Sequence, residues 1–497
     1  MIESKKLNFS VKTLILSLFL TTTTPSVFAQ NYVLDNAIQR FANDSALKHG
    51  QLGLCVMDAQ TGQILGSHNA TMSLIPASNM KIVTTAAGLN MLGADYTFKT
   101  ELQYDGEIQN SILNGNIIIK GYGDPTLGSP EMDSVASMMK FLDSITLKIK
   151  ELGIKKINGK IVGDGSAFDD ATAVKTWLWE DLGNYYGAGP SGLNFRENYY
   201  ELSFLKDPMS GSTPFITGTT PQVPDFQLIN SVKTTYSKDD DAYIFSVPYA
   251  HVGEVRGTIP AGNGHFGISG AMPDPPYFAA WHLRKTLQEH GVEVTDSATT
   301  QLILTQQSAP MPMRKTFLTW HSPSLAAIVK RTNLESNNLY CETILRAIAL
   351  QQTGEGTNEK GTESVTKFWQ SKGIDTEGFF MQDGSGLSPR NGVTPFQLAS
   401  MLRAISIDNQ WFTPFYNSLP EAGKSGTMKN MFKAYPSVLG HLRGKSGTIT
   451  RVKCYSGYAT TQDGRRLIYS AMCNNFTCSQ TEIRKKLEQF MADVCRL

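Results

Sequence analysis

The segment Ile75-Pro76-Ala77-Ser78-Asn79-Met80-Lys81, followed by an apolar stretch that ends at Leu92 and Gly93, decides the fold of this chain. A proline at the start and a glycine after the last apolar residue predict a helix. The helix places the Ser78 hydroxyl and the Lys81 amine one turn apart on the same face. Because its other residues are mostly apolar, we expect Lys81 to be partly buried. Burial favours the neutral amine, which can take the serine proton, and the helix N-terminus offers N–H groups to a developing negative charge.

The pattern Ser-x-x-Lys is weak by itself, because it occurs five times in the chain. The serines are Ser45, Ser78, Ser137, Ser203 and Ser364. A solvated helix face explains the pattern at four of them. Only the one in the apolar segment has the context that a nucleophile requires.

A second motif, Ser336-Asn337-Asn338, stands in a polar segment just before a predicted helix. A hydroxyl at Ser336 could relay protons, and the amide of Asn338 could hold a substrate carbonyl. Taken alone, Ser336 is better explained as a helix cap. The pattern Ser-x-Asn also occurs at Ser67.

A third motif, Lys-Ser-Gly-Thr, lies in a predicted hairpin whose first strand is Leu442–Ile449. Gly447 would let a substrate backbone approach the edge of this strand. Lys445, Ser446 and Thr448 would offer a cation and two hydroxyls to a carboxylate.

The same four letters also occur at Lys424–Thr427. That copy runs into Met428–Phe432, which we expect to be helical. We therefore interpret it as incidental.

The three motifs, in this order, resemble those of the class C low-molecular-mass penicillin-binding proteins, the D-alanyl-D-alanine carboxypeptidases/endopeptidases of peptidase family S13. Three further stretches carry the resemblance: Gly121-Tyr122-Gly123-Asp124-Pro125-Thr126-Leu127, Asp383-Gly384-Ser385-Gly386-Leu387-Ser388 and Ser456-Gly457-Tyr458. The 258 positions between Ser78 and Ser336 discriminate most, because ordinary serine β-lactamases have far shorter gaps there. The chain departs from the usual pattern at Asn337, where Asp is commoner, and at Ser446, where Thr is commoner.

The resemblance implies a multi-domain α/β fold, in which a serine β-lactamase/transpeptidase-like domain is split by an insertion that forms two β-rich domains. That domain contains an antiparallel sheet flanked by helices. The sequence pattern changes along the chain from helical to short strands and turns and then back to helical, which agrees with a domain split by an insertion. We expect the penicillin-binding domain at 30–94 and 310–497. The inserted domains are expected at 95–206 with 263–309, and at 207–262.

The resemblance also implies an acyl-enzyme mechanism. Ser78 would attack the carbonyl of the penultimate D-alanine, with Lys81 as base. The ester formed would then be hydrolysed by water. β-Lactams, which mimic the D-Ala-D-Ala end of peptidoglycan stem peptides, would trap the serine covalently.

The other motif residues have implied roles as well. Ser336, hydrogen-bonded near Lys81, would pass the proton to the leaving amine, and Asn338 would orient the substrate amide. Lys445 would support Ser336, while Ser446 and Thr448 would bind the terminal carboxylate. The backbone N–H groups of Ser78 and Thr448 would form the oxyanion hole.

Three functions compete at this point. The first is the DD-carboxypeptidase/endopeptidase activity that the resemblance implies. The second is a β-lactamase-like or esterase acyl hydrolase, which would use the same residues in a more compact fold, and the third is a binding protein with vestigial motifs. Carboxypeptidase and endopeptidase activities share these residues, so the sequence leaves their balance open. The residues that recognise the stem-peptide side chain and the oligomeric state also stay open.

The composition and the first 29 residues limit the binding partners and the cellular location that we expect. The 497 residues include 45 Lys and Arg against 44 Asp and Glu, a formal charge of +1, which gives no basic surplus for nucleic acid. Residues 1–29 resemble a secretory signal, and cleavage after Ala29 would remove three lysines and one glutamate, leaving −1. We therefore expect an exported, periplasmic protein with no transmembrane anchor in its mature form.

Neither a cofactor nor a metal is expected, because the eight histidines are scattered and metal-ligand spacings are missing. Cys55 and Cys454 are candidates for buried thiols. Cys473, Cys478 and Cys495 are close enough in sequence for a disulfide among them, and their pairing stays open.

Overall fold

The computed structural model describes residues 25–310 and 312–497. The expected signal segment therefore lies outside the described residues, apart from 25–29, which open helix α1 (Pro25–Ala42). Helix α1 ends at Ala42 because Asp44 caps a separate 3-10 turn, Ser45–Leu47, by accepting a hydrogen bond from the backbone N–H of Ala46.

A five-stranded antiparallel sheet joins the two ends of the chain into one unit, which we call the terminal unit. Its order is β18-β19-β20-β1-β2. The N-terminal part supplies β1 (Gln51–Asp58) and β2 (Ile64–His68), and the C-terminal part supplies β18 (Leu442–Ile449), β19 (Val452–Thr460) and β20 (Arg466–Asn474). The predicted hairpin is confirmed, and its first strand, β18, is an edge of the sheet.

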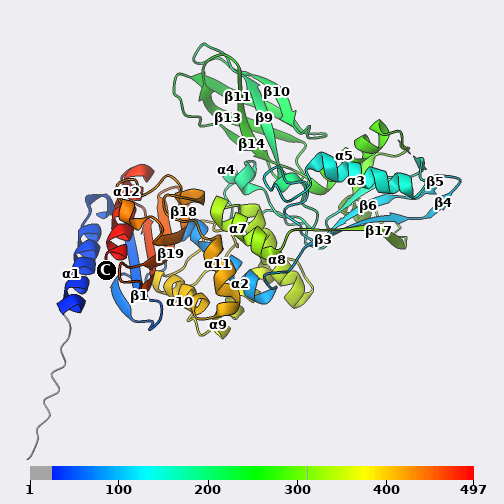
Figure 1. Ribbon diagram of the computed structural model, residues 1–497. Helices are drawn as coiled ribbons and strands as arrows, with labels where there is room; N and C mark the ends of the chain where they lie inside the picture. The colour runs from blue at the N-terminus through cyan, green and yellow to red at the C-terminus, as the bar shows by residue number, and fades with distance from the viewer. Residues whose placement is uncertain (1–24, 311) are drawn as a thin grey trace, which may run out of the picture.

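Helices cover both faces of this sheet (Figure 1). One face carries α1 and α12 (Gln480–Cys495), and the apolar side chains along one side of α12 are buried there. The opposite face carries a larger group: α2 (Met80–Met91), α7 (Leu325–Glu335), α8 (Asn338–Thr353), α9 (Asn358–Ser371), α10 (Pro395–Ser406) and α11 (Asn409–Ser418).

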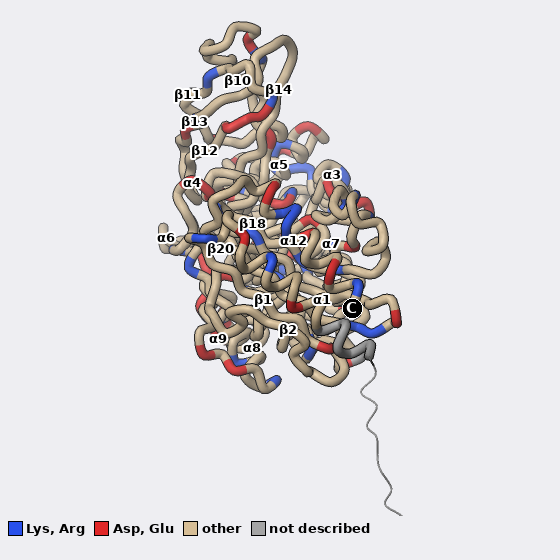
Figure 2. The backbone as a smooth tube through the Cα atoms, turned by 90° about the vertical axis from the view of Figure 1, so that its left-hand side faces the viewer, with Lys and Arg blue, Asp and Glu red and all other residues tan. Residues whose placement is uncertain are grey.

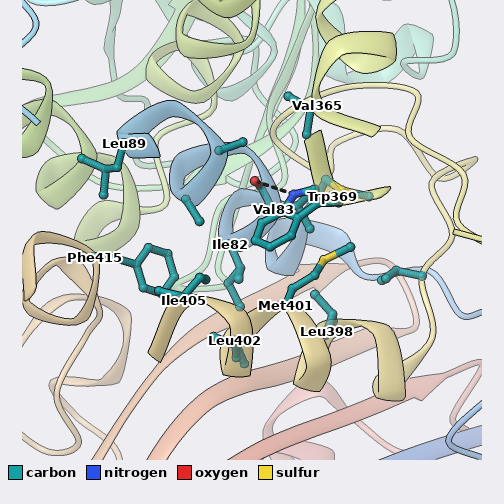
Figure 3. Close-up of a cluster of buried hydrophobic side chains, with 14 of the residues drawn as sticks. Ile82, Val83, Leu89, Val365, Trp369, Leu398, Met401, Leu402, Ile405 and Phe415 are labelled. Carbon is teal, nitrogen blue, oxygen red and sulfur yellow. Dashed lines mark hydrogen bonds between the residues drawn. The ribbon is translucent and has the colours of Figure 1, made fainter. Parts of the chain in front are cut away.

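Helix α2 is held in the centre of this helical layer. Figure 3 shows Ile82 and Val83 surrounded by side chains from α9, α10 and α11. The indole N–H of Trp369 donates to the Val83 carbonyl at 3.3 Å. Burial on all sides fixes the helix that carries Lys81.

The insertion between these two halves begins with a mixed sheet of order β16-β8-β6-β3-β17 and a four-stranded sheet of order β15-β7-β5-β4. The strands of the first are β3 (Lys99–Asp105), β6 (Ile117–Gly121), β8 (Ile161–Asp164), β16 (Ala298–Thr300) and β17 (Arg314–His321); those of the second are β4 (Glu107–Gln109), β5 (Ile112–Asn114), β7 (Lys156–Ile157) and β15 (Glu293–Val294). Helices α3 (Met138–Glu151) and α5 (Pro275–Glu289) pack beside them. The short helix α6 (Gln301–Gln306) contacts β16 and β8, whereas α4 (Trp179–Leu182) contacts strand β12 (Tyr243–Phe245).

Two three-stranded sheets form an arm that rises from the insertion in Figure 1. Their orders are β10-β9-β14 and β11-β13-β12. The strands are β9 (Tyr199–Leu205), β10 (Phe215–Thr220), β11 (Gln227–Thr235), β12 (Tyr243–Phe245), β13 (Val252–Pro260) and β14 (His265–Ala271).

Strand pairing places elements of the insertion beyond the limits expected from the sequence. Strand β17 hydrogen-bonds to β3, although the insertion was expected to end at residue 309. Strands β9 and β14 pair with each other, and β9 also pairs with β10, although both β9 and β14 lie outside the expected range 207–262. Local composition marks turns, whereas these strands are defined by partners far away in the sequence.

Charge is mixed over the surface, and Figure 2 shows Lys and Arg interspersed with Asp and Glu. Within the described part of the chain, no helix combines the length and apolar character needed to span a membrane. The six cysteines are free thiols, with Cys55 and Cys454 buried as expected and no disulfide among Cys473, Cys478 and Cys495.

Candidate active site

The turn that carries Ser78 is tightly constrained. A single 3-10 turn, Ala77–Asn79, leads directly into α2, so Ser78 precedes the helix that carries Lys81. Lys81 Nζ lies 3.1 Å from Ser78 Oγ, as the helical spacing predicts. Ala77 adopts φ +46, a conformation that residues with a side chain rarely take. The backbone immediately before the serine is therefore strained.

Two glycines let other segments approach this turn. A Cβ on Gly386, whose φ is +83, would lie 1.9 Å from the Ala77 carbonyl oxygen. A Cβ on Gly447 would lie 2.4 Å from the Pro76 carbonyl oxygen. Gly447 was expected to admit a substrate backbone. The structure gives a different reason for it, because it lets β18 pack against the Ser78 turn.

Lys81 is completely buried at the junction of three segments. Its Nζ donates to Asn338 Oδ1 at 2.5 Å and to the Ser385 carbonyl at 2.8 Å. Burial lowers the pKa of the Lys81 amine below its ordinary 10.5, and the nearby carboxyl groups of Glu342 and Asp383 act in the opposite direction. The expected buried amine is confirmed, and its pKa shift favours a base.

The second motif lies at a break between two helices. Ser336 ends α7 in the left-handed conformation, with φ +59. Asn337 caps α8, and its Oδ1 accepts from the Tyr340 N–H at 3.1 Å. Ser336 Oγ accepts from Nζ of Lys445, the residue that the resemblance implies as its support, at 2.9 Å. The hydroxyl therefore faces the third motif.

Lys445 is also completely buried, and it donates to the Ser446 carbonyl at 2.8 Å as well as to Ser336. Burial, and then the nearby Lys81, hold the pKa of Lys445 well below 10.5. Two buried amines this close disfavour simultaneous protonation. A negatively charged group brought in beside Lys445 would raise the pKa of this amine.

Ser446 and Thr448 lie on the opposite pleat of β18 from Lys445, since successive strand residues alternate. Ser446 Oγ donates to Thr427 Oγ1 at 2.8 Å, and Lys453 Nζ donates to Thr448 Oγ1 at 2.6 Å. Burial lowers the pKa of Lys453 to about 8.

Thr427 belongs to the copy of the third motif that was interpreted as incidental. Thr427 nevertheless contacts the second copy, because its hydroxyl accepts the hydrogen bond from Ser446. The helix expected over Met428–Phe432 is also missing, because only a 3-10 turn, Gly426–Met428, forms there. The Gly426 backbone, with φ +52, turns the chain against Leu334 and brings Thr427 to β18.

The arrangement thus combines a serine, a buried lysine and a hydroxyl–lysine pair from three distant segments. The model of the D-Ala-D-Ala carboxypeptidase 3 (S13) family matches residues 34–494. The chain belongs to this family.

Relatives of this S13 chain span nearly its full length. D-alanyl-D-alanine carboxypeptidase DacB of Haemophilus influenzae is 26% identical over 449 residues, which cover 88% of each chain. D-alanyl-D-alanine carboxypeptidase of Actinomadura sp. (strain R39) is 28% identical over 456 residues, covering 88% of this chain and 80% of the relative.

The crystal structure of penicillin binding protein 4 (dacB) from H. influenzae superposes with a TM-score of 0.79 at 22% identity, covering 93% of this chain and 99% of that one. This likeness confirms the expected α/β fold class.

The carboxyl group of Glu342 lies close to Lys81, and no motif of the sequence had indicated it. Glu342, completely buried on α8, accepts hydrogen bonds from the N–H groups of Ser385 (2.7 Å) and Gly384 (3.2 Å). It thereby holds the loop whose Ser385 carbonyl accepts from Lys81. Burial and the nearby Asp383 raise the pKa of Glu342 to about 7. The signal was present, since Glu342 is one helical turn beyond Asn338 in a mostly apolar helix.

We expect Glu342→Gln to weaken this support. A glutamine presents an NH₂ group to one of two N–H donors, so one hydrogen bond is lost in a buried site. The free energy of unfolding should fall by about 1–3 kcal/mol. Acylation by a fluorescent penicillin should slow by up to about 10²-fold, because the serine–lysine geometry loosens.

Thermal unfolding measures the loss of stability, and time courses of acylation by the fluorescent penicillin measure the loss of rate. Glu363→Gln, at an exposed position on α9, is the matched control and should change neither. If the Glu342→Gln variant is acylated at the wild-type rate, the loop that contains Gly384 and Ser385 needs no support from α8.

Proposed function

We propose that this S13 chain is a serine DD-peptidase that cleaves peptidoglycan stem peptides ending in D-Ala-D-Ala through an ester on Ser78. One observation carries the proposal: side chains from segments more than 100 positions apart form two hydrogen-bonded pairs around one serine. Lys81 bridges Ser78 and Asn338, and Lys445 contacts Ser336. The two relatives reported above are D-alanyl-D-alanine carboxypeptidases by name.

Acylation requires that the Ser78 proton leave as the Oγ–carbon bond forms. Neutral Lys81, 3.1 Å away, is placed to accept it. The carbon–nitrogen bond of the terminal residue then breaks, and the leaving amine takes a proton through Ser336. Asn338, whose Oδ1 already contacts Lys81, would orient the substrate amide with its NH₂ group. The N–H groups of Ser78 and Thr448 would stabilise the oxyanion.

The terminal carboxylate of the substrate would bring a negative charge to this edge of the sheet. That charge would raise the pKa of the Lys445 amine and favour its protonated form. The hydroxyls of Ser446 and Thr448 would bind the carboxylate from the edge strand, with Thr427 and Lys453 behind them. Binding would therefore place a cation next to Ser336 when the leaving amine needs a proton.

Water completes the cycle by attacking the Ser78 ester and releasing the shortened peptide. β-Lactams would acylate the same serine, and the ester formed from them would be hydrolysed slowly. Because peptidoglycan lies outside the cytoplasmic membrane, we propose a periplasmic location for the mature chain.

Incubation of the purified protein with two substrates tests this proposal. A stem pentapeptide ending in D-Ala-D-Ala should lose its last residue, and a cross-linked muropeptide should be split if the site admits a partner strand. Liquid chromatography with mass spectrometry follows both products. Rapid turnover of penicillin with neither peptide cleaved would support a β-lactamase-like acyl hydrolase instead.

A further inference from the structure

The insertion reaches the second motif through one buried acidic residue, Glu197. It lies in the 3-10 turn Arg196–Asn198, where all three residues have positive φ angles of 55°, 55° and 52°. Hydrogen bonds hold this unusual turn in place. Asn198 Oδ1 accepts from the Phe195 N–H at 2.9 Å, and Asn198 Nδ2 donates to the Gly189 carbonyl at 3.0 Å. Such a rigid turn fixes where the carboxylate of Glu197 points.

The carboxylate faces α8 in the terminal unit. Glu197 Oε2 accepts from Asn337 Nδ2 at 3.0 Å, and Oε1 accepts from the hydroxyls of Tyr340 (2.8 Å) and Ser129 (2.5 Å). These three donors are neutral. The adjacent arginines contact other groups, with Arg331 on Glu131 and Arg196 on the Tyr199 carbonyl.

Polarity makes the contact with Asn337 specific. Asn337 Oδ1 is occupied as the cap of α8, so its Nδ2 must point at Glu197. An aspartate at this position could cap the helix equally well, but it would present an oxygen to the Glu197 carboxylate. The asparagine that departs from the commoner aspartate is therefore matched to the carboxylate opposite it.

Asn337 stands between two residues of the site. Ser336 Oγ accepts from Lys445, and Asn338 Oδ1 accepts from Lys81. The insertion also contacts Asn338 directly, since Asn338 Nδ2 donates to the Tyr186 carbonyl at 2.7 Å. Figure 1 shows α7 and α8 on the side of the terminal unit that faces the insertion.

We propose that Glu197 is a positioning residue of the reaction, through which the insertion fixes the orientation of Ser336 and Asn338. This inference rests on the proposed function, because its readout is acylation. It predicts that the insertion contributes to the rate of acylation, through a contact made before substrate arrives.

Exchanging the polarity of the pair tests the proposal. Glu197→Gln replaces one of the two carboxylate oxygens, which together accept three hydrogen bonds, with an NH₂ group, and Asn337→Asp places two carboxylates opposite each other. Each single variant should slow acylation by a fluorescent penicillin, by up to about 10²-fold, with kcat for peptide cleavage reduced more than KM is raised. The double variant restores one donor and one acceptor, and it should recover most of the wild-type rate.

The double variant separates positioning from loss of fold, with melting temperature measured for all proteins. Glu131→Gln, close by and exposed, is the matched control and should acylate like the wild type. Single variants that acylate at the wild-type rate overturn the proposal. A double variant that melts like the wild type and stays as slow as the singles overturns it too. Failure of the wild type itself to acylate would count against the proposed function.

Discussion

Ser78→Ala is expected to lose both peptide cleavage and labelling by a fluorescent penicillin. The substitution removes the only atom that forms the ester, and the rest of the site cannot replace it. Losses on the order of 10⁶-fold accompany removal of the nucleophile in a serine peptidase. The fold should survive, because the change deletes one hydroxyl in a turn that its backbone and the α2 packing define.

The chain offers its own control for this variant. Ser364 belongs to another Ser-x-x-Lys sequence, on helix α9 away from the sheet edge. Ser364→Ala should label and cleave like the wild type. In-gel fluorescence and a D-alanine release assay measure the two activities, and labelling of Ser78→Ala would remove Ser78 as the nucleophile.

Lys81→Met is expected to slow acylation by about 10²–10⁴-fold, the usual contribution of a positioned base. Methionine retains the length of the side chain, but it leaves Asn338 Oδ1 and the Ser385 carbonyl without their donor. Some stability should be lost with these two hydrogen bonds.

The pH profile distinguishes a base from a structural amine. Burial lowers the pKa of Lys81 below 10.5, and only the neutral form accepts the serine proton. The acylation rate of the wild type should therefore rise with pH along a limb below 10.5, and Lys81→Met should lack this limb. Lys367→Met, the lysine of the control sequence on α9, should keep the wild-type profile. An unchanged limb in Lys81→Met would assign the base to another group.

The sequence predicted those parts of the molecule that local patterns determine. The apolar stretch to Gly93 marked α2, and alternating residues marked the hairpin of β18 and β19. The family resemblance that the three motifs carry implied the split of the terminal unit, and the sheet order confirms it.

What the sequence could not supply depends on contacts between distant segments. Glu197 and Asn337 are 140 positions apart, and Glu342 contacts a loop more than 40 positions away. Thr427 directly precedes Met428–Phe432, which was expected to be helical, and the packing of Gly426 against Leu334 decides the conformation there instead. Boundaries of the insertion shifted for the same reason, because strand partners define them.

Mass spectrometry of the protein after reaction with benzylpenicillin tests most directly whether Ser78 forms the acyl-enzyme. We predict a single adduct with the mass of the whole penicillin, because the lactam ring opens without losing an atom. After digestion with trypsin the adduct should lie on the peptide 49–81, which ends at Lys81, and on Ser78 rather than on Ser67 or Ser73 in the same peptide. An adduct on any other residue, or none under conditions in which the folded protein is shown to be intact, would contradict it.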